Sequence, residues 1–143
     1  MYSYRTRKNW KWAVPAAAIL TVAGLFIAKA AYAKLIGNTI DPVLTVNDNG
    51  RHIIVTGPTV CTSSEKSDLR VTVTQRSTGA VAEGRARFTC TGDLQHWEAL
   101  ATTVGREAFV EGPAIAVAIA TTNDRGTTTD AHQWLVKVTL VGE

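Results

Sequence analysis

Apolar and polar residues alternate along two adjacent stretches of the chain, at positions 69–76 and 82–90. An alternation with period two places one set of side chains on each face of a β-strand. Ser77-Thr78-Gly79-Ala80 separates the two stretches and has the composition of a tight turn. The sequence therefore predicts a β-hairpin with one apolar and one polar face. The apolar set is Leu69, Val71, Val73, Ala82, Gly84, Ala86, Phe88 and Cys90, and the polar set is Arg70, Thr72, Thr74, Arg76, Glu83, Arg85, Arg87 and Thr89.

The same pattern predicts further short strands on either side of this hairpin. Strands at Val43 to Val46 and His52 to Thr56 flank the turn signal Asn47-Asp48-Asn49-Gly50. A short strand at Thr59 to Thr62 carries Cys61, and a strand from Gln95 to Val104 holds Trp97, Ala99 and Ala101 on one face. Ile115, Val117 and Ile119 alternate with alanines, which indicates a strand covered on both faces. After a turn at Asn123-Asp124-Arg125-Gly126, the inward row of the last strand is Trp134, Val136, Val138 and Leu140.

These segments predict an all-β fold. From position 34 to 143 there are 18 Thr, 13 Val and 6 Ile, so a third of 110 residues carry the β-branched side chains that favour strands. Seven or eight short strands with regular turn signals favour an immunoglobulin-like antiparallel β-sandwich, with a small closed barrel as the alternative. Both tryptophans of this part follow the second cysteine, unlike the motif of a true immunoglobulin domain. We expect the domain to span residues 43–143, after a short lead-in at 34–42.

The first 33 residues have the layout of an export signal. Arg5, Arg7, Lys8 and Lys11 precede an apolar run of 17 residues, positions 12–28, that is expected to form a hydrophobic helix. Ala31-Tyr32-Ala33 then supplies the small-x-small pattern at which a signal peptidase cleaves. The alternative is an uncleaved anchor, because 17 residues lie at the lower limit for spanning a hydrocarbon core of roughly 30 Å. Either interpretation predicts a secreted or extracytoplasmic domain, in the second case tethered to the plasma membrane by residues 12–28.

Charge and cysteines support that assignment. Five of the 15 Lys and Arg residues lie in positions 1–33 and all 12 acidic residues lie after them, so the remainder carries 10 − 12 = −2 and offers no argument for nucleic-acid binding. Cys61 and Cys90 are the two cysteines of the exported part. An even count in an oxidising compartment predicts one disulfide, with two buried free thiols as the alternative.

Several short motifs resemble a family of small secreted actinobacterial domains without assigned function. The resemblance covers roughly residues 53–140. It implies export and a β-sandwich, and it brings no activity with it. A second cysteine pair that such domains often carry near the last turn is absent from positions 121–127. The motifs are Cys61, the segment Val71-Thr72-Val73-Thr74-Gln75, Gly84, the segment Phe88-Thr89-Cys90-Thr91-Gly92, Trp97 and Gly112-Pro113-Ala114.

No arrangement of residues predicts catalysis, a metal site or a cofactor. His52, His96 and His132 lack the spacing of paired metal ligands, although the last two could meet if their strands were neighbours. Ser63, Ser64, Ser67 and Ser77 occupy loop-like stretches without a nucleophile elbow. Phe88 and Trp134 are expected to face inward, which leaves little aromatic surface for recognition.

The polar face of the predicted hairpin is the one candidate docking surface. Arg70, Arg76, Arg85 and Arg87 could bind an anionic cell-wall polymer, and the alternative is an ordinary solvated face. We therefore expect a non-enzymatic interaction or structural module of the bacterial cell envelope, whose partner is a protein or a wall polymer. A secreted inhibitor of an exogenous protease or muramidase, with Asn123 to Asp130 as its binding loop, is the second hypothesis. An enzyme of unrecognised type that uses the three histidines is the third.

Overall fold

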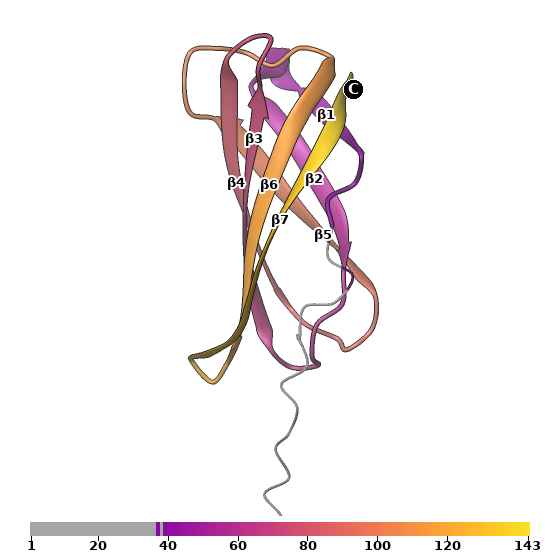
Figure 1. Cartoon of the computed structure of the whole chain (residues 1–143), viewed down its shortest axis with the longest axis vertical. Helices are drawn as coiled ribbons and strands as arrows, with labels where there is room; N and C mark the ends of the chain where they lie inside the picture. Colours follow the sequence, from indigo (N-terminus) through magenta and orange to yellow (C-terminus); the bar gives the residue numbers. More distant parts are fainter. Residues whose placement is uncertain (1–36, 38) are drawn as a thin grey trace, which may run out of the picture. The chain divides into compact units, whose positions relative to one another are not determined.

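The computed structural model describes residue 37 and residues 39–143 (Figure 1). The predicted signal at 1–33, with its cleavage residues Ala31 and Ala33 and its apolar helix at 12–28, lies outside the described residues, as do positions 34–36 and 38 of the lead-in. The described part contains seven strands and one short 3-10 turn. They are β1 (Val43–Asn47), η1 (Asp48–Gly50), β2 (His52–Thr59), β3 (Lys66–Gln75), β4 (Ala80–Thr89), β5 (Gln95–Thr103), β6 (Gly112–Asp124) and β7 (Thr127–Gly142).

The seven strands form one closed barrel in the order β1-β2-β5-β4-β3-β6-β7. The all-β prediction is confirmed, but the expectation of two separate sheets is wrong. β4 pairs with both β3 and β5, and β1 pairs with both β2 and, in parallel, β7, so the sheet has no break. The β4–β5 and β1–β2 pairings each span three residue pairs and the β1–β7 pairing spans four, which makes these the shortest pairings in the barrel.

The β4–β5 pairing is possible because Gly84 has no side chain. A Cβ atom on Gly84 would lie 2.9 Å from the backbone oxygen of Leu100 and 3.0 Å from the Cα of Ala101. Any larger residue would push β5 away from β4, because a Cβ has no room beside the backbone there. Glycine at this position therefore allows the barrel to close.

The β3–β4 hairpin is confirmed with its predicted faces. The two strands pair over ten positions from Lys66↔Thr89 to Gln75↔Ala80, and Gly79 at φ +76° completes the turn. The predicted apolar row of β3 is fully buried, and that of β4 is buried or partly buried. The predicted turn at 47–50 contains η1 and joins β1 to β2, and the last turn joins β6 to β7 through Arg125 and Gly126, both at positive φ.

A separate strand at Thr59 to Thr62 is not present. β2 runs from His52 through Pro58 to Thr59, and Cys61 follows it outside any strand. Residues 39–41 pass alongside this part of β2, where Asp41 N donates to Thr56 O at 2.8 Å. Gly57 allows that approach, since a Cβ there would lie 2.1 Å from Thr39 O.

β6 differs from the expected strand covered on both faces. Its alanines face the core, and Ile115 and Val117 face outward and are only partly covered, while Ile119 is exposed. The register explains the choice of face, because the alanines lie directly beside the buried row of β3, as in Val71↔Ala118 and Val73↔Ala116. The central strand of this side of the barrel therefore presents its larger side chains to the outside.

Two tertiary links complete the barrel. Cys61 and Cys90 form the predicted disulfide, with 5.4 Å between their Cα atoms, and it joins the ends of β2 and β4, which are not neighbours in the sheet. At the β3–β4 turn, the fully buried Gln75 donates to Val110 O at 2.8 Å and accepts from Val110 N at 2.9 Å. The side-chain amide of Gln75 thus donates to and accepts from the backbone of one residue, as a neighbouring strand would. These bonds hold in place the loop before β6, in which Phe109 is buried.

Candidate functional site

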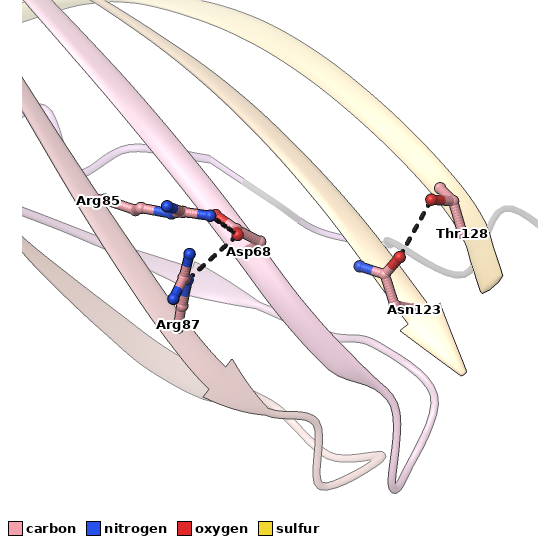
Figure 2. Close-up of polar contacts among 5 residues, drawn as sticks. All are labelled: Asp68, Arg85, Arg87, Asn123 and Thr128. Atoms are coloured by element: carbon pink, nitrogen blue, oxygen red, sulfur yellow. Dashed lines mark hydrogen bonds and ion pairs between the residues drawn. The ribbon is translucent and has the colours of Figure 1, made fainter. Parts of the chain in front are cut away.

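The polar face of β3 and β4 contains a compact cluster of one carboxylate and two guanidinium groups (Figure 2). We call Asp68, Arg85 and Arg87 the arginine cluster. Asp68 lies directly opposite Arg87 in the strand register. It accepts a hydrogen bond from Arg85 Nε at 2.7 Å, a second from Arg85 Nη2, and one from Arg87 Nε at 3.2 Å. The cluster is therefore a bidentate arginine–carboxylate pair with a second arginine attached.

Asp68 is the residue that the sequence analysis missed. Its side chain has the same parity along the strand as Arg70, so the observed alternation, extended by one step, places it on the same face. The predicted strand begins at Leu69 and therefore leaves out the counter-ion of the arginines. Lys66, one step further upstream, also lies on this face and is exposed.

The cluster fixes the ionisation of its members. The hydrogen bond from Arg85 is the largest cause that lowers the pKa of Asp68, partial burial opposes it, and the charges of Arg85 and Arg87 lower that pKa further. The same hydrogen bond raises the pKa of Arg85. Both groups thus remain charged at neutral pH, and Asp68 offsets part of the positive charge that the sequence assigned to this face.

The four arginines of the predicted docking surface do not all lie together. Arg70 lies directly opposite Arg85 and therefore beside the arginine cluster, although like charges in such a position repel each other. Arg76 follows the end of β3, six residues from Arg70 and so about 20 Å along the strand direction. It lines a separate hollow with Lys137, Pro113 and Ile115. The structure thus groups Arg70, Arg85 and Arg87 and separates Arg76 from them.

An apolar stripe borders this basic region. We use this name for Leu100, Val117, Ile119 and Leu135, whose side chains point away from the core. Leu135 lies directly opposite Val117, while Leu100, Val117 and Ile119 line one hollow of about 540 Å³ together with Arg70 and Arg85. Exposed fractions of 55% for Leu100, 48% for Ile119 and 61% for Leu135 are large for aliphatic side chains. Basic and apolar side chains therefore share one surface.

A second hollow, of about 700 Å³, lies where the start of β3 meets the β6–β7 turn. Its lining mixes cations with anions, including Lys66, Arg87 and Asp124. At the turn itself Thr128 Oγ1 donates to Asn123 Oδ1 at 3.0 Å (Figure 2), and the side chain of Arg125 is 92% exposed. This turn is the tip of the segment from Asn123 to Asp130 that the inhibitor hypothesis invokes.

The histidines are far apart in the sheet. His52 contacts Thr102 Oγ1 at 3.1 Å and Asp48 Oδ2 at 3.1 Å beside the β1–β2 turn. His96 lies on β5 and His132 on β7, which are not neighbours in the barrel, and His132 instead lies beside Trp134 with ring centroids 5.6 Å apart. Within residues 39–143, no three His, Cys, Asp or Glu side chains lie together where they could hold a metal ion.

The candidate serines are also dispersed. Ser63 and Ser64 are exposed in the loop between β2 and β3, and Ser77 is exposed in the β3–β4 turn. Ser67 differs from the loop prediction, because it lies within β3 and is buried. Its Oγ has no hydrogen-bond partner among the described residues.

Comparisons with known proteins found no relative of this chain, so the site is assessed from its geometry alone. No protein-family model matches the chain, and no curated protein matches it. In the part of the chain that the structure describes, no helix is long and apolar enough to cross a membrane.

Proposed function

We propose that this chain is a non-enzymatic extracytoplasmic module of the bacterial cell envelope that acts by binding a partner. The observation that carries the proposal is the surface where the apolar stripe borders Arg70 and Arg85. Exposed apolar surface is costly to maintain in a monomer and is typical of interaction sites. Arginine is also more frequent in protein interfaces than on the rest of the surface.

The extracytoplasmic location is part of the proposal. The Cys61–Cys90 disulfide is compatible with an oxidising compartment, and the charged and apolar leader at 1–33 has the layout of an export signal. Cleavage after Ala33 would release the domain, and retention of residues 12–28 would tether it. The resemblance to small secreted actinobacterial domains supports the same assignment.

The order of the strands supports a finer proposal about the fold. β1, β2 and β5 are neighbours on one side, and β3, β6 and β7 are neighbours on the other. Immunoglobulin-like domains arrange strands A, B and E, and strands C, F and G, in the same way. We therefore propose an immunoglobulin-like domain in which β4 pairs with both halves.

A capture experiment with the full-length chain tests the proposed function. The exported protein, immobilised through its C-terminus, is exposed to envelope extracts and to wall polymers, and binding is measured against concentration. We expect a saturable partner whose binding is weakened by Leu135→Ser and unchanged by Leu94→Ser, a control at a leucine of similar exposure (65%) in the loop before β5. Recovery of no saturable partner from either source contradicts the proposal.

Inhibition of an exogenous hydrolase is the second candidate. The exposed Arg125 at the tip of the β6–β7 turn favours it, because a protruding basic side chain on a tight turn can enter an active-site cleft. A screen of proteases and muramidases tests it. Inhibition that is lost in Arg125→Ala is the expected result, and activity that stays unchanged across the panel rejects this candidate.

A further inference from the structure

The outer face of β3, β6 and β7 has the composition of an interface rather than of a solvated sheet. Across these strands the register forms two rows, Arg70–Ile119–Gln133 and Thr72–Val117–Leu135. Val117 lies directly opposite Leu135, with Cβ atoms about 5 Å apart, and Ile119 follows Val117 two positions along the same face of β6, so these three side chains make one apolar patch. Leu100 on β5 lies across the hollow from this patch, with polar side chains of β3 and β4 between them.

The charges at the border of this patch are mostly positive. Arg70 lies beside Ile119 and Lys137 lies beside Ile115, at opposite ends of the outward row of β6. Arg76 lines the hollow next to Lys137. Within residues 39–143 none of these three cations forms an ion pair. Glu83 is the one acidic residue that lines the hollow beside Leu100 and Ile119. A partner would therefore meet unpaired positive charge on both sides of an apolar surface.

We infer that this face binds a segment of a partner protein in which aliphatic side chains alternate with or lie close to aspartate and glutamate. The inference rests on the proposed function and names its partner class. Aliphatic side chains of the partner would enter the hollow between Leu100 and Ile119, and its carboxylates would pair with Arg70 and Lys137. Arginine suits this role because its planar guanidinium binds carboxylates in a bidentate manner.

Charge and shape argue against two other occupants. A second copy of the chain, docked face to face, would bring the positive charges around the two patches together. Such an interface would lack the charge complementarity that favours specific partners. An anionic bilayer would match the cations, but a lipid surface offers no protruding group to fill a concave hollow, and Glu83 would face its negative charge. An acidic aliphatic protein segment satisfies both the charge and the hollow.

Selection from a library of random linear peptides displayed on phage tests this inference with the full-length exported chain. Peptides are selected on the unaltered protein and then counter-selected on a Leu135→Ser, Arg70→Glu double variant. We expect the surviving peptides to be enriched in Asp or Glu together with Leu, Ile or Val. In fluorescence anisotropy, each single substitution should weaken their binding by at least about tenfold, which corresponds to about 1.4 kcal/mol.

Two matched variants serve as controls. Leu94→Ser removes a leucine of similar exposure, and Arg106→Glu makes the same change of charge in the exposed loop before β6. Both should bind the selected peptides as the unaltered protein does. Higher salt should weaken binding to the unaltered protein more than to Arg70→Glu, because the variant has lost the ion pair at Arg70 and keeps only the one at Lys137.

The outcomes separate the inference from the proposed function. If the envelope partner binds but is insensitive to both Leu135→Ser and Arg70→Glu, the proposed function stands and this face is not its site. If no peptide survives counter-selection, or if vesicles of phosphatidylglycerol and phosphatidylcholine bind the chain in a Leu135-dependent way, an acidic protein segment is the wrong partner. If neither envelope extracts nor wall polymers contain any partner, the proposed function itself fails.

Discussion

Gln75 offers the sharpest test of how the barrel is held together. Its side-chain amide makes two hydrogen bonds with the backbone of Val110, at 2.8 and 2.9 Å, and accepts a third from Thr78 Oγ1 at 3.2 Å. Gln75→Ala removes all three. A net loss of about 0.5–1.5 kcal/mol for each of the two bonds to Val110 gives about 1–3 kcal/mol, and the cavity left by the side chain adds to it. We expect a decrease of about 2–4 kcal/mol in the free energy of unfolding.

The measurement is equilibrium unfolding in denaturant, followed by the fluorescence of the tryptophans in β5 and β7. Gln133→Ala is the matched control, because Gln133 is exposed on β7 and should change the free energy of unfolding by less than about 0.5 kcal/mol. A loss in Gln75→Ala no larger than that of the control would refute the reasoning, since the Val110 loop would then be held by other contacts.

Gln75→Glu adds a dependence on pH to the same test. The carboxylate keeps the acceptor for Val110 N but places negative charge beside Val110 O, and burial raises the pKa of such a group. A protonated glutamic acid can donate to Val110 O and restore the lost bond. The variant should therefore be more stable relative to the unaltered protein at about pH 4 than at pH 7. Equal destabilisation at both values would contradict the geometry at this site.

Three further predictions concern the β4–β5 seam, the arginine cluster and the disulfide. Gly84→Ala should lower the free energy of unfolding by about 1–3 kcal/mol through overpacking at the seam, whereas Gly105→Ala, with nothing near its Cβ, should leave it within about 0.5 kcal/mol. Because the pKa of Asp68 is lowered, its ion pairs stabilise the fold above about pH 4 and lose that effect as the pH falls. The free energy of unfolding of Asp68→Asn, measured against pH, should therefore decrease less steeply below about pH 4 than that of the unaltered protein. Replacing Cys61 and Cys90 by alanine should cost about 3.5 kcal/mol in the same measurement, and a loss below about 1 kcal/mol would contradict a disulfide that restrains the unfolded chain.

Alternation along the chain predicted the strands well where a row of side chains is clearly apolar. The hairpin of β3 and β4 follows from residues 69–90, because large aliphatic residues at every second position leave one choice of face. The pattern was insufficient for β6, where both sets of side chains are apolar. An alternation with period two separates the two faces of a strand but does not show which face points inward. In β6 the inward face is the one whose residues lie beside the buried row of β3.

Closure of the barrel could not be predicted from local patterns. The β4–β5 seam depends on Gly84, whose place in an inward row does not reveal which backbone atoms of β5 lie beside it. The alternation of apolar residues predicts the arginines of the cluster but not Asp68, because Asp68 precedes the first aliphatic residue of its strand. The stripe with Leu100 and Leu135 joins residues far apart in sequence, so it became visible only with the register in place.

Thiol trapping in intact cells tests the central claim, that this chain folds and acts outside the cytoplasm. Free thiols are alkylated before lysis, the chain is purified from separated cytosolic and envelope or secreted fractions, and its peptides are identified by mass without reduction. The account predicts an envelope or secreted product in which the peptides of Cys61 and Cys90 are joined and unalkylated. A cytosolic product with both cysteines alkylated would contradict it.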